Sequence, residues 1–192
     1  MTIVIMIIGG ILSLALPRMG LKKLDNRTVF RNIVITVKEI RNRARLYNTS
    51  YRIAFKIDEK GGNYWVEKSS SPTLLDKNFL EKEREQKERD EKGVLVDEKN
   101  QISSPFQTDT SYSKGNVELP NGYHVKSLES GPQDATFTEG VGYIHIFPQG
   151  LVEPIALQIV DPKKNVWTLV FNSITGQADI IDGAKSLKDL SR

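Results

Sequence analysis

The chain begins with a long apolar run. Residues 1–16 carry no charged side chain, and their polar residues are limited to Thr2 and Ser13. At a rise of about 1.5 Å per residue, this run would form a helix roughly 24 Å long, which is shorter than the ~30 Å hydrocarbon core of a bilayer. The run therefore predicts most of a membrane-spanning helix, and we expect residues 1–17 to be transmembrane.

A second apolar pattern follows Pro17 without a break. Its apolar residues recur every three or four positions, which is typical of an amphipathic helix. They are Leu21, Leu24, Phe30, Ile33, Val34, Val37, Ile40 and Ala44. Residues 48–50, with the sequence NTS, end the pattern because their side chains compete for backbone hydrogen bonds. We expect one N-terminal helix over residues 1–48, kinked at Pro17. The residues expected to pack it against the rest of the protein are Phe30, Ile33, Val34, Val37 and Ile40.

The remainder of the chain has a pattern typical of β-strands. Apolar residues alternate with polar or small ones from Tyr51 to Ile57, and two glycines at 61 and 62 separate this run from a second one at 64–66. Such a pair predicts a β-hairpin. Further strands are predicted at residues 142–147, 155–160, 166–171 and 178–181. The predicted fold class is therefore α+β: a long N-terminal helix, an antiparallel β-sheet head over residues 49–183, and a C-terminal tail over 184–192.

A highly charged segment interrupts the head. It contains the run EKEREQKERDEK, in which glutamates precede lysine or arginine by four positions. These i, i+4 pairs favour a solvated helix. We interpret residues 73–101 as a charged helical insertion on the surface of the head, with a docking arm for a neighbouring subunit as the alternative interpretation.

The charge and the absence of cysteine limit the chemistry. With no cysteine, disulfides, thiolate nucleophiles and cysteine-bearing metal sites are excluded. The net charge of +3 leaves most of the 27 cations offset by 24 anions, so a nucleic-acid partner is permitted but not indicated. No phosphate-binding loop or catalytic triad stands out. We expect no enzyme activity, no cofactor and no small-molecule substrate.

Metal binding is also not expected. His124 and His145 are the two histidines, and His145 lies on a predicted strand, where a packed histidine is more common than a ligand. Calcium at Asp161, Asp179 or Asp182 was considered, but their spacing matches no recognised calcium loop.

The segment IVIMIIGGILSLALPRM, continuous with an amphipathic helix, resembles the N-terminus of type IV pilins and type II secretion pseudopilins. In that family a GFTLIE motif, cut by a prepilin peptidase, precedes the apolar stretch. Aligning on Pro17 places this motif upstream of Met1, so we expect the start of the natural protein to lie further upstream. The pairing of YRIAFKID with NYWVE, and the later order FPQG, WTLVF and TG, resemble the GspH and FimT-like subgroup.

The resemblance implies a structural minor pseudopilin of a type II secretion pseudopilus. It implies a single pass through the bacterial inner membrane, a head in the periplasm, and assembly with other pseudopilins and inner-membrane components of the secretion machine. The residues that would contact lipid and then neighbouring filament helices are Ile3, Val4, Ile7, Ile8, Gly10, Ile11, Leu14 and Pro17.

Two alternatives to this role are kept. The first is a FimT-like minor pilin that binds DNA during uptake. The candidate residues for contact with DNA, or with a protein partner, are Arg27, Arg31, Lys38, Arg41 and Arg45. The second is a secreted soluble β protein whose apolar N-terminus is a signal-like sequence.

Overall fold

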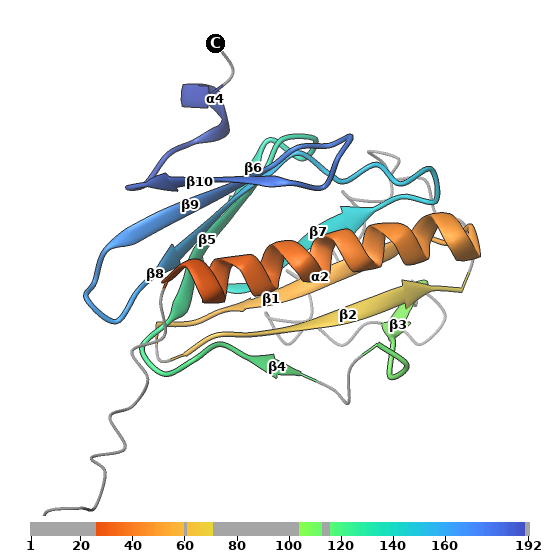
Figure 1. The fold of residues 1–192 in the computed structure, drawn as a ribbon, viewed down its shortest axis with the longest axis horizontal. Helices are drawn as coiled ribbons and strands as arrows, with labels where there is room; N and C mark the ends of the chain where they lie inside the picture. Colours follow the sequence, from red (N-terminus) through yellow and green to blue (C-terminus); the bar gives the residue numbers. More distant parts are fainter. Residues whose placement is uncertain (1–25, 60, 71–103, 113–115, 191–192) are drawn as a thin grey trace, which may run out of the picture.

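The computed structural model describes residues 26–59, 61–70, 104–112 and 116–190 (Figure 1). The expected membrane segment at 1–17 and the charged insertion at 73–101 lie outside the described residues. Among the helices that the structure describes, none is long and apolar enough to cross a membrane.

The described chain consists of a helix, a set of β-strands and a short final helix. Their bounds are α2 Asn26–Tyr47, β1 Tyr51–Ile57, β2 Asn63–Ser69, β3 Phe106–Thr108, β4 Val117–Glu118, β5 His124–Ser130, β6 Ala135–Phe137, β7 Gly140–Ile146, β8 Ile155–Val160, β9 Val166–Phe171, β10 Ala178–Asp182 and α4 Leu187–Leu190.

Helix α2 corresponds to the amphipathic half of the predicted N-terminal helix. It ends at Tyr47, as the NTS sequence indicated, and Asn48 takes a left-handed conformation with φ of 49°. The Thr49 amide then donates to the carbonyl of Ala44 at 3.1 Å, which satisfies one of the last helical acceptors.

The strands that the structure describes form one 10-stranded sheet with the main order β10-β9-β8-β5-β1-β2-β3. The predicted hairpin is confirmed, since β1 pairs antiparallel with β2. Strands β7, β8, β9 and β10 match the four further predictions to within two residues at each end. The antiparallel arrangement needs one correction, because β5 joins β1 in parallel through Ile57 and Val125. Parallel strands cannot be joined by a short turn, and the long stretch of chain between β1 and β5, which includes β2, β3 and β4, permits this pairing.

Strand β5 was not predicted, although it lies in the middle of the sheet. Its pairing with β8 shifts register between Val125 and Ser127, which is a β-bulge. The bulge breaks the two-residue alternation by which a strand is recognised in a sequence. The short strands β3, β4 and β6 were also missed, because two or three residues are too few to show a period.

Helix α2 lies across one face of the sheet, with β9 and β10 on one side of it and β2 on the other (Figure 1). The core forms between this helix and the inward-facing residues of the strands, such as Ile53, Phe55, Ile144 and Leu157. Because side chains alternate along a strand, Arg52 and His145 point to the opposite face. The sheet therefore has an apolar face under α2 and a second face with buried polar groups.

Candidate assembly surface around helix α2

The inner face of α2 is built into the core of the head. Phe30, Ile33, Val37 and Ile40 are buried, and Val34 packs against the core while remaining partly exposed. The ring of Phe30 lies 5.7 Å from that of Trp167 on β9 and 6.5 Å from that of Tyr123, centroid to centroid. Burying each such side chain contributes about 1.5–3 kcal/mol. The helix is therefore fixed to the head along its whole described length.

The first residue of α2 is also tied to the head, through the turn between β8 and β9. Asn26 Nδ2 donates to Asp161 Oδ2 at 2.9 Å. The hydroxyl of Tyr123 donates to Asn26 Oδ1 at 2.5 Å. These bonds join three segments that lie far apart in the sequence, at the first described residue of α2. We call Asn26, Tyr123 and Asp161 the junction.

The carboxylate of Asp161 is held by several donors at once. The amides of Lys163 and Asn165 donate to Oδ1 at 2.8 and 2.9 Å. Trp167 Nε1 donates to Oδ2 at 3.2 Å, and Asn165 Nδ2 does so at 3.1 Å. Burial alone raises the pKa of Asp161, but hydrogen bonds from Asn26, Asn165 and Trp167 outweigh it and lower the pKa to about 2.

The surroundings of Asp161 argue against the calcium site that was considered there. Both of its oxygens already accept from N–H groups, which a cation would repel. Asp179 and Asp182 belong to a different element, strand β10. Within the described part of the chain, no group of three or more histidine and acidic side chains is placed to hold a metal ion.

Arg41 takes part in the fold rather than presenting a free cation. Its Nε donates to the carbonyl of Gly150 at 2.6 Å, and its Nη2 donates to the carbonyl of Ile174 at 2.6 Å. The side chain of Arg45 lies so close to Gly150 that an added Cβ there would collide with it. Arg41 and Arg45 therefore fasten the loops after β7 and β9 to the last turns of α2. No sequence pattern indicated this role.

The other sequence-predicted cations lie on the same flank of the helix. Positions 27, 31, 38 and 45 are separated by four and seven residues, so at 3.6 residues per turn they form one row. Arg27, Arg31 and Arg45 are exposed, and Lys38 is partly exposed. This row and the exposed outer side of α2 form the candidate assembly surface. The predicted lipid and filament residues at positions 3–17 lie outside the described residues.

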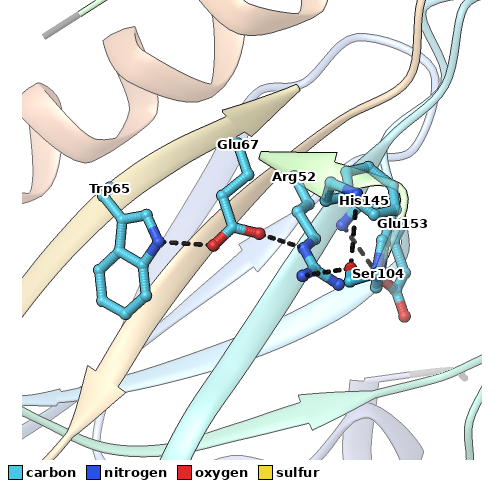
Figure 2. A network of polar contacts seen from close by, with 7 residues as sticks. Arg52, Trp65, Glu67, Ser104, His145 and Glu153 are labelled. Carbon is cyan, nitrogen blue, oxygen red and sulfur yellow. Dashed lines mark hydrogen bonds and ion pairs between the residues drawn. The ribbon is translucent and has the colours of Figure 1, made fainter. Parts of the chain in front are cut away.

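The opposite face of the sheet holds a buried ion pair (Figure 2). Arg52 Nε donates to Glu67 Oε2 at 2.5 Å, and Trp65 Nε1 donates to Glu67 Oε1 at 2.7 Å. The guanidinium carbon of Arg52 lies 4.4 Å from the centroid of the Phe106 ring and 4.0 Å from that of Tyr143. Through these contacts, and through a 3.1 Å bond from Arg52 to Ser104 Oγ, the segment before β3 is fastened to the sheet.

A second buried pair lies beside the first. His145 Nδ1 is 2.6 Å from Glu153 Oε2, and the His145 amide donates to the same oxygen at 3.1 Å. Ser130 also hydrogen bonds to Glu153. As expected, His145 is packed in the interior, but it is not fully satisfied, because its Nε2 atom has no hydrogen-bond partner among the described residues. Since His145 and Glu153 are both buried, we assign this cluster to the stability of the sheet.

Three aromatic residues of β2 and β9 differ in how deeply they are buried. Tyr64 is buried and stacks on Phe55, with ring centroids 5.4 Å apart. Trp65 and Trp167 are partly buried, and each donates to a carboxylate, Glu67 and Asp161 respectively. These three residues therefore serve the packing of the head.

Comparison with protein-family models gives no match, and comparison with curated proteins gives none either. The similar solved structures include two of the minor pseudopilin EpsH from the type 2 secretion system of Vibrio cholerae. The first has a TM-score of 0.47 at 10% identity and covers 82% of this chain and 98% of that one. The second has a TM-score of 0.45 at 10% identity and covers 81% and 92%.

Proposed function

We propose that the chain is a structural minor pseudopilin of a type II secretion pseudopilus. One observation carries the proposal: the amphipathic helix that follows the apolar run is fixed to a β-rich head along one face, while its other face remains exposed. An N-terminal helix that is apolar in its first half and carries a head on its second half is what we expect of a subunit that is stored in a membrane and later assembles beside other subunits.

The junction supports this arrangement. Asn26 is held by Asp161 and Tyr123, so the start of the described helix is fixed to the head. In the proposed protein, residues 1–17 complete a single pass of the inner membrane with the head in the periplasm. Leaving the bilayer then exchanges lipid contacts of this segment for contacts with neighbouring helices, and the partners are other pseudopilins and inner-membrane components.

The test is the recovery of the protein in filaments. The full natural protein, produced in its own host, is expected in the sheared filament fraction. Ile7→Lys places a charge in the apolar segment and is expected to remove it from that fraction, since a central charge costs about 2.5–3.5 kcal/mol in a membrane helix. Ile180→Lys, at an exposed position on β10, is the matched control and should assemble normally. Equal recovery of both variants would contradict the proposal.

The row of cations on α2 favours DNA uptake as a second candidate function. Binding through phosphates should weaken as salt rises, with a slope that reports the number of contacts. Changing Arg27 and Arg31 together to glutamine should lower retention on DNA and reduce that slope. This candidate function would be eliminated if the parent protein and the double variant were retained equally on DNA, or if retention of the parent protein did not depend on salt.

A further inference from the structure

A cavity of about 400 Å³ lies where β1, β5, β8 and β9 begin or end. In the sheet register, His124 of β5 is opposite Val160 of β8, and Val160 is opposite Val166 of β9. These three residues line the cavity, together with Ile57 and Val125, where β1 meets β5. The volume is within the range of small-molecule sites, about 300–1,000 Å³. Adjacent strands therefore form a partly apolar wall of this cavity.

The cavity adjoins the junction. Val160 and Lys164, which both line it, lie on either side of Asp161 in the chain, and Asp161 accepts the hydrogen bond from Asn26. The turn between β8 and β9 and the start of α2 are accordingly found at the same end of the head (Figure 1). The cavity is therefore at the end of the head where α2 begins.

Charged side chains of both signs line the cavity. In the sheet order β9-β8-β5-β1, Lys164 comes from the turn between β8 and β9, and Lys126 comes from β5. Asp58 and Glu59 directly follow β1, at the other border. Asp58 also lies 3.5 Å from the amine of Lys56. The cavity therefore has cations on one side and carboxylates on the other, which is complementary to a ligand with one anionic and one cationic group.

Lys164 has an unusual backbone conformation. Its φ is 69°, which lies in the left-handed region that L side chains rarely adopt. Its amide donates to the carbonyl of Asp161 at 2.9 Å, and the amide of Asp161 donates to the carbonyl of Asn165 at 2.9 Å. In a hairpin loop of this kind the left-handed position favours glycine, which avoids the strain. A lysine at this position lowers the stability of the turn while it places a cation at the cavity.

We propose that the cavity binds the headgroup of a phospholipid that carries both a phosphate and a primary ammonium group, which is a phosphoethanolamine headgroup. The phosphate accepts hydrogen bonds from Lys126 and Lys164, and the ammonium donates hydrogen bonds to Asp58 and Glu59. The bound headgroup orients the head on the membrane before assembly.

The inference rests on the proposed function, which turns the end of the head where α2 begins toward the bilayer. Eight residues separate Pro17, at the end of the apolar segment, from Asn26. Even a fully extended chain of that length reaches at most about 30 Å. The cavity is therefore kept close to the lipid surface, where the local concentration of headgroups is high.

The experiment uses the full natural protein, purified in a mild detergent and freed of bound lipid. The protein is titrated with short-chain forms of phosphatidylethanolamine, phosphatidylcholine and phosphatidylglycerol, and native mass spectrometry gives the Kd of each lipid. The ammonium of phosphatidylcholine is trimethylated and donates no N–H hydrogen bond, and phosphatidylglycerol has no cation. We expect phosphatidylethanolamine to bind at least about tenfold more tightly than either of the other two lipids.

Two neighbouring lysines provide a matched pair of variants. Lys163 and Lys164 are both exposed in the same turn, and of the two only Lys164 lines the cavity. Lys164→Glu should weaken the binding of phosphatidylethanolamine at least about tenfold, and Lys163→Glu should change it less than about twofold. Lys164→Gly separates binding from stability. Because glycine relieves the positive φ, this variant should unfold at a higher urea concentration than the parent protein and still bind the lipid more weakly.

The double variant Asp58→Asn with Glu59→Gln tests the carboxylates. It should lose the preference for phosphatidylethanolamine over phosphatidylcholine, because the ammonium of either lipid then meets a neutral border. Binding of both lipids should still depend on Lys164.

Glycerophosphoethanolamine, which has the same headgroup without acyl chains, distinguishes a lipid from a soluble phosphate ester. It should bind at least about tenfold more weakly than the lipid, because lipid and protein share the micelle and the effective concentration of the lipid is higher. Equally tight binding of the soluble compound would assign the cavity to a soluble ligand and overturn the lipid assignment.

The inference would also be overturned by equal Kd values for the three lipids, by equal effects of the two glutamate substitutions, by unchanged binding to Lys164→Gly, or by an unchanged preference in the double variant. Recovery in sheared filaments separates this failure from that of the proposed function. A protein that enters filaments without a headgroup preference refutes the lipid site alone, whereas a protein absent from filaments refutes the proposed function.

Discussion

The junction at Asp161 allows a quantitative prediction. Asp161→Asn keeps the size of the side chain but replaces one oxygen by an NH2 group, which would face the donors of Asn26, Asn165 or Trp167. The folded protein lowers the pKa of Asp161 from 3.8 to about 2. At about 1.36 kcal/mol per unit of pKa, the folded state favours the charged carboxylate by roughly 2 kcal/mol. We therefore expect Asp161→Asn to lower the free energy of unfolding by about 2 kcal/mol.

The assay is urea denaturation of the full protein in a mild detergent, followed by the fluorescence of Trp167 and Trp65. Asp179→Asn is the matched control, because Asp179 is exposed on β10 and its replacement should change the free energy of unfolding by less than about 0.5 kcal/mol. A loss for Asp161→Asn no greater than that of the control would refute the view that this carboxylate fastens α2 to the head.

The same carboxylate predicts an acid dependence. Because its folded pKa lies below the unfolded value of 3.8, its contribution is complete above about pH 4 and is lost as the pH falls toward 2. The parent protein should lose this contribution over that window, and Asp161→Asn should not. Parallel stability curves for the two proteins from pH 5 to pH 2 would contradict the assignment.

Two further substitutions test other contacts. Gly150→Ala should lower the free energy of unfolding by at least about 1 kcal/mol, because φ is 81° at Gly150 and the side chain of Arg45 occupies the space of the new methyl group. Gly61→Ala is the control. Gly61 has open space around it, so this change should leave the free energy of unfolding unchanged in the same assay. Arg52→Lys should lower the free energy of unfolding by about 1–3 kcal/mol. An ammonium group cannot both stack between the rings of Phe106 and Tyr143 and bond to Glu67 as the guanidinium does. An unchanged midpoint of urea denaturation would contradict this expectation.

The sequence predicted those features whose signals are local. The spacing from Phe30 to Ala44 indicated α2, and the glycines between Ile57 and Tyr64 indicated the first hairpin. Strand β5 escaped detection because the bulge after Val125 interrupts its alternation, and its parallel pairing with β1 depends on the path of the chain between them.

In the candidate assembly surface, too, features with a local sequence signal could be predicted and contacts between distant residues could not. The row of cations on α2 could be listed from helical spacing, but nothing local distinguishes Arg41, which bonds to carbonyls more than a hundred residues away, from its exposed neighbours. Calcium binding at Asp161 was one hypothesis, although the spacing of Asp161, Asp179 and Asp182 matches no recognised calcium loop. Its actual partners include Asn26, 135 positions earlier in the chain, and no local pattern records such a contact.

The most direct test of the central claim is where the full natural protein is found, together with the accessibility of its head. Membranes and soluble fractions are separated from the host, and spheroplasts are treated with a protease that cannot enter the cytoplasm. We expect the protein to remain with the inner membrane after washing with high salt, and we expect the protease to remove residues beyond 26. A protein found wholly in the soluble fraction with an unprocessed N-terminus would contradict it.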